Sequence, residues 1–205
     1  MARRLTARGE RRRRQLMEVA AERFAVAGYH PTSIADIVDA VGVGKGVFYW
    51  YFASKEELFE QILVEAQRDL RRTQRAAIAD EPDPLRRIEA GVRASVAWLD
   101  EHRHLFTLFE LARADERFAP VIRRGEEQAV ADTLPHVVAG MDADLIRRED
   151  PLVVAYAILG VVDRLTRVLV LEEDRPAEAV ADAAVAFCLQ GLVSPAAARA
   201  RLAFR

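Results

Sequence analysis

Residues 32–58, which read TSIADIVDAVGVGKGVFYWYFASKEEL, constrain the fold of this chain more than any other segment. Near the start of the segment, apolar residues recur at the spacing of one helix face: Ile34, Ile37, Val38 and Val41. Thr32 or Ser33 suits the N-cap of that helix, because either hydroxyl can accept from a free backbone N–H. Gly42 is expected to end the helix, since glycine enters the left-handed conformation without steric cost.

A second short helix is predicted from Lys45 to about Tyr51, and it is unusually rich in aromatic residues. The five consecutive aromatics at 48–52 would point in all directions around a helix, so they cannot all lie in a core. Phe48 and Phe52 lie four positions apart and share a face that suits packing. The side chains between them are left to project elsewhere.

Two short helices joined by a tight turn form the motif that lays its second helix in the DNA major groove. Here the outer face of the second helix would combine Tyr49 and Trp50 with the cation of Lys45 and the small residue Gly46. Such a surface suits contact with phosphates and bases. The alternative is that Tyr49, Trp50 and Tyr51 pack against neighbouring helices.

A third helix is predicted to begin directly after these two. Ser54 followed three residues later by Glu57 is a capping box. The N-terminus of a helix offers free N–H groups and the positive end of the dipole, and Lys55 adds a full charge there. The pattern predicts a phosphate contact at Lys55; the alternative is a solvated surface lysine.

Together these features resemble the N-terminal domain of the TetR/AcrR family of transcriptional regulators. The residues that carry the resemblance are Ala20, Phe24, Gly28, Thr32, Ile37, Val41, Gly42, Val43, Lys45, Gly46, Phe48, Tyr49, Tyr51, Phe52, Lys55, Glu56 and Leu58. The resemblance implies a DNA-binding site made of Thr32, Ser33, Gly44, Lys45, Gly46, Val47, Tyr49, Trp50, Tyr51 and Lys55. Two positions depart from the family pattern: Gly44 stands where a hydroxyl residue is common, and Trp50 where Tyr or His is more frequent.

Beyond residue 58 the chain alternates apolar helical patterns with proline and glycine breakers. Helices are predicted over 54–80, 84–101, 103–113, 118–139, 149–172 and 176–192. Pro135 lies inside one of these patterns and is expected to kink or end that helix. The chain is therefore predicted to be all-α. Its expected parts are a basic and flexible arm (1–10), a helix-turn-helix DNA-binding domain (11–57) and a helical effector-binding and dimerisation domain (58–205).

The formal net charge of −2 conceals an asymmetry along the chain. Basic residues outnumber acidic ones up to Lys55, and acidic residues outnumber basic ones after it. A basic unit on an acidic body fits the binding of a polyanion through one end. Arg3, Arg4 and Arg8 could form an arm that reaches the minor groove, or a tail that is merely solvated. The four arginines at 11–14 are expected to begin the first helix.

The last two predicted helices, 149–172 and 176–192, are apolar around much of their circumference, so a second buried face is expected. In the resembled family the last two helices pair with their symmetry mates in a four-helix bundle. The resemblance thus implies a homodimer, which would set two reading helices on a palindromic site. The expected interface residues are Tyr156, Leu159, Ala179, Val180, Ala183 and Phe187. The alternative is that these helices only fill the core of one subunit.

A small-molecule effector of unknown identity is expected to bind among the central helices. Apolar walls with a few polar groups describe such a pocket. The candidate residues are Trp98, His102, Phe106, Phe109, Glu110, Arg113, Asp163 and Arg167. Each aromatic alone also suits a plain core, Glu110 can pair with Arg113 at i+3, and the last two can form interface ion pairs.

Motifs for catalysis, metal binding and cofactors do not emerge from the sequence. His102 and His104 are two apart, too close for a metal pair at i and i+4 on a helix. No GxSxG, Walker or dinucleotide loop is present, and the lone Cys188 fits a buried thiol. No enzyme activity, cofactor or metal is therefore expected. Without a signal peptide or membrane span, the expected location is cytoplasmic.

The expected function is a ligand-responsive, DNA-binding transcriptional regulator. Repression is the commoner outcome in the resembled family, so release of a repressor from a palindromic operator by a small molecule is favoured. The alternatives are a helical ligand-binding or scaffolding protein that does not use its helix-turn-helix, and a small helical enzyme. Salt-dependent DNA binding separates the first reading from the second, because contacts with phosphates weaken steeply with salt.

Overall fold

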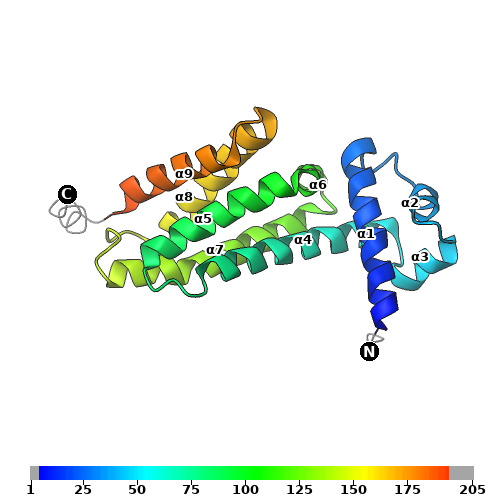
Figure 1. Ribbon diagram of the computed structural model, residues 1–205, viewed down its shortest axis with the longest axis horizontal. Helices are drawn as coiled ribbons and strands as arrows, with labels where there is room; N and C mark the ends of the chain where they lie inside the picture. The colour runs from blue at the N-terminus through cyan, green and yellow to red at the C-terminus, as the bar shows by residue number, and fades with distance from the viewer. Residues whose placement is uncertain (1–4, 194–205) are drawn as a thin grey trace. The chain divides into compact units, whose positions relative to one another are not determined.

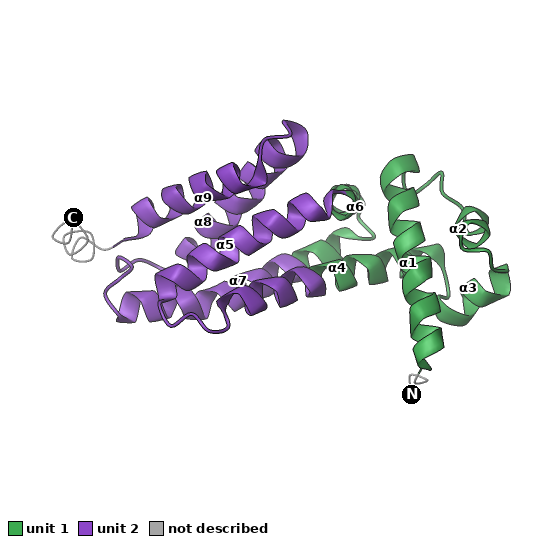
Figure 2. Ribbon diagram, in the orientation of Figure 1, with its two compact units in different colours: residues 1–67, 104–123 green, residues 68–103, 124–205 purple. Residues whose placement is uncertain are grey.

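The computed structural model describes residues 5–193, which form nine α-helices and one π-helical segment and contain no β-strand (Figure 1). The predicted all-α fold is confirmed. The chain divides into two compact units (Figure 2). Unit 1 contains the described residues up to 67 together with 104–123, and unit 2 contains 68–103 together with the described residues from 124 onward.

Unit 1 is a helical cluster built around aromatic side chains. Its elements are α1 (Ala7–Ala27), α2 (Ile34–Val41), α3 (Lys45–Tyr51), the first half of α4 (Lys55–Ile78), α6 (Arg103–Ala114) and the first turn of α7 (Ala119–Asp142). The Phe59 ring centroid lies 5.4 Å from that of Phe24, 4.9 Å from Tyr29 and 4.7 Å from Phe118. These four rings join α1, the turn after it, α4 and the turn between α6 and α7.

The first helix begins earlier than predicted. Thr6 is its N-cap, and the Thr6 hydroxyl accepts from the backbone N–H of Gly9 at 3.2 Å. Residues 7–10, expected to belong to a flexible arm, are therefore helical, because this cap satisfies a backbone N–H at the new start. Arg8 lies in α1. Arg3 and Arg4 fall outside the described residues.

Unit 2 contains the second half of α4 and most of the C-terminal helices. Its other elements are α5 (Pro84–Glu101), the rest of α7, α8 (Pro151–Leu165), the π-helical segment η1 (Thr166–Glu172) and α9 (Ala177–Leu192). α5 and α8 both begin at an Asp-Pro pair, in which the Asp83 or Asp150 carboxylate accepts from the N–H two residues on. α5 packs along α9, as Figure 1 shows within this unit, and buried aliphatic side chains fill the space between the helices.

Most predicted helix bounds lie within a few residues of the observed ones, with two differences. α7 continues through Pro135 to Asp142, so the helix does not end at the proline. The buried side chains of Val137 and Met141 hold the turns after Pro135 in the core of unit 2. The second difference is η1, which gives the end of the predicted 149–172 helix a π-helical form.

Packing extends unit 1 beyond the predicted DNA-binding domain of residues 11–57. Leu58, Phe59 and Leu63 of α4 are buried in its core, and so is Leu108 of α6. The division by function at residue 57 stays a prediction, and it differs from the division by packing.

Two other features of residues 5–193 concern the length of the apolar helices and the environment of Cys188. None of their helices has both the length and the apolar character that crossing a membrane demands. Cys188 is buried in the core of unit 2, and this burial raises the pKa of its thiol.

Gly140 of α7 lies against the loop that follows this helix. A Cβ built on Gly140 would lie 2.5 Å from Cδ1 and 2.8 Å from Cγ1 of the buried Ile146. We expect Gly140→Ala to lower the free energy of unfolding by about 1–2 kcal/mol, because overpacking exceeds the gain in helix propensity. Gly91→Ala in α5, whose Cβ would meet nothing within 4 Å, should raise it by about 0.5–1 kcal/mol. Urea denaturation of the two variants measures both changes, and equal effects would contradict the close contact.

Candidate nucleic-acid interface and ligand cavity

The helix-turn-helix is fixed by caps at both ends of α2. Ser33 is the N-cap: its hydroxyl accepts from the N–H of Asp36 at 3.2 Å, and an Asp36 carboxylate oxygen accepts from the N–H of Ser33 at 2.8 Å. The Ser33 hydroxyl also donates to the Asp36 carboxylate at 2.7 Å, and the hydrogen bonds from the Ser33 side chain and backbone hold the pKa of Asp36 below its ordinary value. Gly42 ends the helix in the left-handed conformation, with φ of 71°. The predicted start and end of this helix are confirmed.

α3 separates a packing face from an exposed face. Phe48, and Phe52 directly after the end of α3, are buried in the core of unit 1, as predicted. Tyr49 and Trp50 are 56% and 52% exposed, and Val47 is exposed beside them. This exposed pair rules out core packing within the subunit as the explanation for both side chains.

Other predicted DNA-binding residues extend the exposed face of α3. Gly44, the N-cap of α3, is exposed, as are Lys45 and Gly46 in its first turn. Tyr51 is only partly buried, and its ring stands edge-on to that of Trp50 at 4.5 Å. The exposed residues of α3 thus combine apolar side chains with the cation of Lys45.

The arginine-rich start of α1 lies beside the end of α3. The Arg13 guanidinium stands over the Phe52 ring at 5.7 Å, and a Cβ built on Gly9 would lie 3.6 Å from the Tyr51 hydroxyl. Arg8 and Arg11, on the same helix, are exposed. The basic residues that the sequence places far from α3 are thus close to it in space.

Thr32 is turned inward, contrary to its predicted contact with DNA. Its side chain is buried, and the hydroxyl donates to the backbone carbonyl of Gly28 at 2.8 Å. That hydrogen bond closes the turn between α1 and α2. The side chain therefore supports the motif from within, because its only donor is already used.

Lys55 also differs from its predicted role. Its ammonium group donates to the carbonyls of Tyr29 at 2.8 Å, His30 at 3.3 Å and Thr32 at 2.8 Å, and it stands 4.4 Å from the centroid of the Tyr29 ring. An ammonium has three N–H donors, so these three acceptors fill it. Partial burial lowers the pKa of Lys55. The phosphate contact predicted from sequence is therefore replaced by a clamp on the α1–α2 turn.

A polar cluster that sequence reasoning missed surrounds the buried Tyr29. The Tyr29 hydroxyl donates to the Glu56 carboxylate at 2.9 Å, and Arg117 stands 5.5 Å from the Tyr29 ring centroid. Arg117 also pairs with Asp115 at 2.7 Å and with Glu56 at 3.7 Å. The hydrogen bonds from Arg117 lower the pKa of Asp115 to about 2. Burial and the neighbouring Glu56 raise the pKa of Tyr29. The cluster ties the α6–α7 turn to the start of α4.

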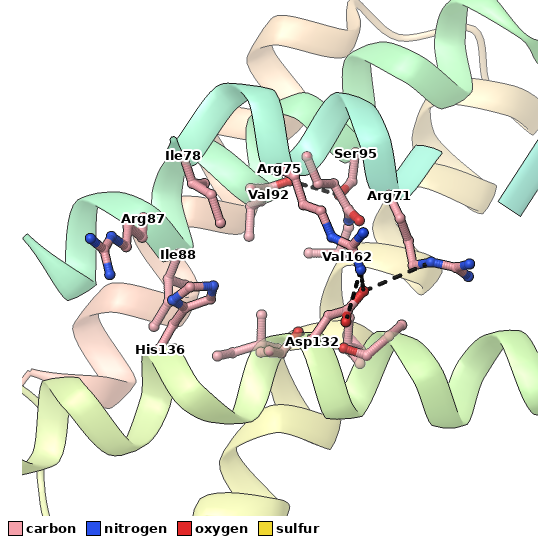
Figure 3. A pocket seen from close by; sticks show the side chains of 16 residues that line it. Arg71, Arg75, Ile78, Arg87, Ile88, Val92, Ser95, Asp132, His136 and Val162 are labelled. Carbon is pink, nitrogen blue, oxygen red and sulfur yellow. Dashed lines mark hydrogen bonds and ion pairs between the residues drawn. The ribbon is translucent and has the colours of Figure 1, made fainter. Parts of the chain in front are cut away.

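Unit 2 contains a partly open cavity of about 150 Å³, shown in Figure 3. Helices α4, α5, α7 and α8 line it. The lining residues are Arg71, Gln74, Arg75, Ile78, Arg87, Ile88, Gly91, Val92, Ser95, Ala129, Asp132, Thr133, His136, Ile158, Leu159 and Val162. Aliphatic side chains make up much of its wall, and its polar groups gather at two ends (Figure 3).

One end of the cavity holds a shared carboxylate. Asp132 lies 3.2 Å from the Arg75 guanidinium and 3.8 Å from that of Arg71, and it accepts from the Gln128 amide at 3.0 Å. The other end holds Arg87 and His136, near Ile88 (Figure 3). Burial and the positive charge of Arg87 lower the pKa of His136.

None of the eight residues predicted for the effector site lines this cavity. Phe106, Phe109, Glu110 and Arg113 belong to unit 1, where Glu110 and Arg113 pair at 2.9 Å. The other four belong to unit 2: Trp98, His102, Asp163 and Arg167. The predicted residues are therefore divided between the two units, and their part in effector binding stays a prediction.

The unit 2 members of that set have other contacts. The indole N–H of the buried Trp98 donates to the Asp69 carboxylate at 2.9 Å. The His102 ring stacks on the Trp98 ring, with 4.4 Å between the ring centroids. Asp163 and Arg167 form an ion pair at 3.3 Å on α8 and η1. Within residues 5–193, no three His, Cys, Asp or Glu side chains gather as a metal site would require.

The predicted interface residues are divided between surface and core. Tyr156 of α8 is exposed, and Phe187 of α9 is 67% exposed. Ala179 and Ala183 are exposed on α9, and Leu159 is half-buried beside the cavity. Val180 differs, because it is buried in the core of its own unit and offers no surface to a partner.

Comparisons with known proteins agree with the geometry of unit 1. The profile of a family described as "Bacterial regulatory proteins, tetR family" matches residues 16–62. The HTH-type transcriptional repressor DhaR of Mycobacterium sp. (strain GP1) is 31% identical over 140 residues, which are 67% of this chain and 71% of that protein. The chain belongs to the TetR family.

Two other known proteins match a smaller share of this chain or only its fold. The HTH-type transcriptional repressor KstR2 of Mycobacterium tuberculosis is 29% identical over 57% of this chain, and the match spans about 60% of KstR2. A transcriptional regulator from Saccharomonospora viridis, solved in complex with choline, superposes with a TM-score of 0.79 at 17% identity. It covers 90% of this chain and 99% of its own, which shows a shared fold.

The two lysines of the chain, Lys45 and Lys55, make a matched pair for testing the clamp. We expect Lys55→Met to lower the free energy of unfolding by about 1–2 kcal/mol, because three charge-assisted hydrogen bonds are lost at a partly exposed site. Lys45→Met, at an exposed position, should change it by less than about 0.5 kcal/mol. Chemical denaturation measures both values. Equal free energies of unfolding for the two variants would show that Lys55 has no structural role.

Proposed function

We propose that this TetR-family protein is a ligand-responsive transcriptional repressor that binds double-stranded DNA through α3. The observation that carries the proposal is the pair of exposed aromatics, Tyr49 and Trp50, on a short helix whose opposite face is buried. A large exposed aromatic surface is costly in water unless a partner covers it. The names of DhaR and KstR2, both described as repressors, support repression over activation.

Each exposed group of α3 has a suitable partner on DNA. Tyr49 and Trp50 contact base edges or sugars in the major groove, and the Lys45 ammonium neutralises a phosphate. Gly44 and Gly46 allow the backbone to approach the DNA closely, because neither carries a side chain. The exposed arginines at the start of α1 supply further charge beside α3.

The regulatory part of the proposal uses the cavity in unit 2 as the effector site. The single helix α4 carries Lys55 and Glu56 of the helix-turn-helix at one end, and Arg71 and Arg75 of the cavity towards the other. A ligand that binds one conformer better than another shifts the population by its differential affinity. The ligand is therefore proposed to favour a conformer of α4 in which DNA binding is weaker.

The exposed apolar face of α8 and α9 supports a homodimer. Leu152, Val153 and Tyr156 are exposed on α8, and Phe187 on α9, while the two helices pack against each other. Burying this face against a second copy would remove apolar area from water and place two α3 helices on one DNA site.

The DNA-binding proposal is tested by titrating the purified protein against the DNA that flanks its own gene at two salt concentrations. We expect selective binding, and Lys45→Met should reduce the slope of log K against log salt by about one. Lys55→Met should leave that slope unchanged, because its ammonium is not free to meet a phosphate. Trp50→Ala should change the preference among sites.

Two outcomes count against the proposal. Binding no tighter than to random DNA, across a genomic fragment library as well as the flanking DNA, would leave a helical ligand-binding protein as the better reading. An unchanged site preference in Trp50→Ala, together with an unchanged one in Tyr49→Ala, would exclude α3 as the reading helix.

The dimer is tested by sedimentation of Phe187→Asp. We expect the variant to be monomeric, since a charge would be buried in the apolar interface. Val26→Asp is the control, because Val26 lies on α1 and is 90% exposed, outside the proposed interface. A dimer that persists in Phe187→Asp, and in Tyr156→Asp as well, would show that this face is not the interface.

A further inference from the structure

The cavity of unit 2 has more positive than negative charge in its wall. Three of its lining residues are arginines, Arg71, Arg75 and Arg87, and Asp132 is the one acidic residue among them. Three positive charges and one negative charge leave a surplus of two. The His136 imidazole adds little to this, because burial and Arg87 keep its pKa low.

The two ends of the cavity differ in how this charge is balanced. At one end, Asp132 is already engaged by Arg71, Arg75 and the Gln128 amide. At the other end, Arg87 and His136 line the cavity, and no acidic residue is among the lining residues there. Figure 3 shows the His136 ring beside the open space and the Arg87 guanidinium at the outer edge of this end. The Arg87 Nε donates to the backbone carbonyl of Glu81, which orients the guanidinium and leaves its two terminal nitrogens as further donors. This end suits a planar anion such as a carboxylate.

The space between the two ends suits a short apolar group. Ile78, Ile88, Val92, Ile158 and Val162 line it, from α4, α5 and α8. Its volume of about 150 Å³ is similar to that of an engineered apolar cavity known to admit benzene. No Phe, Tyr or Trp lines the wall, so the aromatic cage that holds quaternary ammonium groups is missing from this site.

We infer that the effector is a small amphipathic carboxylate, with its anionic head on Arg87 and His136 and its apolar body against Ile88 and Val162. This inference rests on the proposed function, in which the cavity is the effector site. It names the chemical class that the site selects. The competing class is an organic cation whose head lies on Asp132.

The test compares ligands of one shape and three charges. Hexanoate, hexan-1-ol and hexylamine form one set, and benzoate, benzyl alcohol and benzylamine form another. Binding to the full-length protein is measured by calorimetry at constant ionic strength and pH 7, with thermal stabilisation as a second readout. In at least one set, we expect the carboxylate to bind tenfold or more tightly than its alcohol and its amine.

Variants locate the head group and separate the two classes. Arg87→Met should weaken carboxylate binding tenfold or more, whereas Arg86→Met, at the exposed neighbouring position, should leave it unchanged. Asp132→Asn should preserve or tighten carboxylate binding, because it removes the one negative charge from the wall. A cation bound at Asp132 would instead be lost in that variant. If Arg87→Met does not fold, the ligand ranking in the wild-type protein and in Asp132→Asn still decides between the classes.

Several results would overturn the inference. These are an amine that binds tightest and is lost in Asp132→Asn, the absence of carboxylate binding in both sets, or carboxylate binding that is equal in Arg87→Met and Arg86→Met. DNA binding is measured separately on the same preparations. Selective DNA binding without carboxylate binding would contradict this inference but not the proposed repressor function. Carboxylate binding without DNA binding would contradict the repressor function but not the chemical class of the ligand.

Discussion

The buried Tyr29 ring and the charges around it form the interaction on which unit 1 depends. Lys55 stands over one part of the ring and caps the backbone of the α1–α2 turn, while the hydroxyl is held by Glu56. Arg117 brings the α6–α7 turn to the same ring. Because α2 follows this turn directly, the cluster fixes where the helix-turn-helix begins. A cation in this position stabilises the fold through carbonyl groups that would otherwise need water.

The cavity in unit 2 is lined partly by charged side chains from several helices. Arg71 and Asp132 have side chains only 21% and 31% exposed, so their charges are partly removed from water. Partial burial strengthens the interaction of each charge with an incoming ligand, because solvent screens it less. The same burial makes an unbalanced charge costly in the empty site. A ligand of opposite charge would offset that cost, which makes the charge surplus a source of selectivity.

Local patterns predicted the elements of the helix-turn-helix well, and contacts between distant residues explain what they missed. The Ser33 cap and the split of Phe48 from Tyr49 follow from spacing within one or two turns. The inward roles of Thr32 and Lys55 depend on the path of the α1–α2 turn, which no local pattern encodes. The cavity was missed because its polar groups come from several helices, and each reads alone as a solvated charged face. Aromatic residues drew the prediction to α6, where Phe109 packs in unit 1 instead.

The two tryptophans of the chain report on the two units separately. Trp50 is exposed on α3 in unit 1, whereas Trp98 is buried in unit 2. The Trp98 indole donates a hydrogen bond to Asp69 of α4, and Asp69 lies within one helical turn of Arg71 and Arg72. An exposed indole emits at longer wavelength than a buried one, since water relaxes around its excited state. The unmodified protein thus carries two natural optical probes, one on the exposed face of α3 and one on the helix that helps to line the cavity.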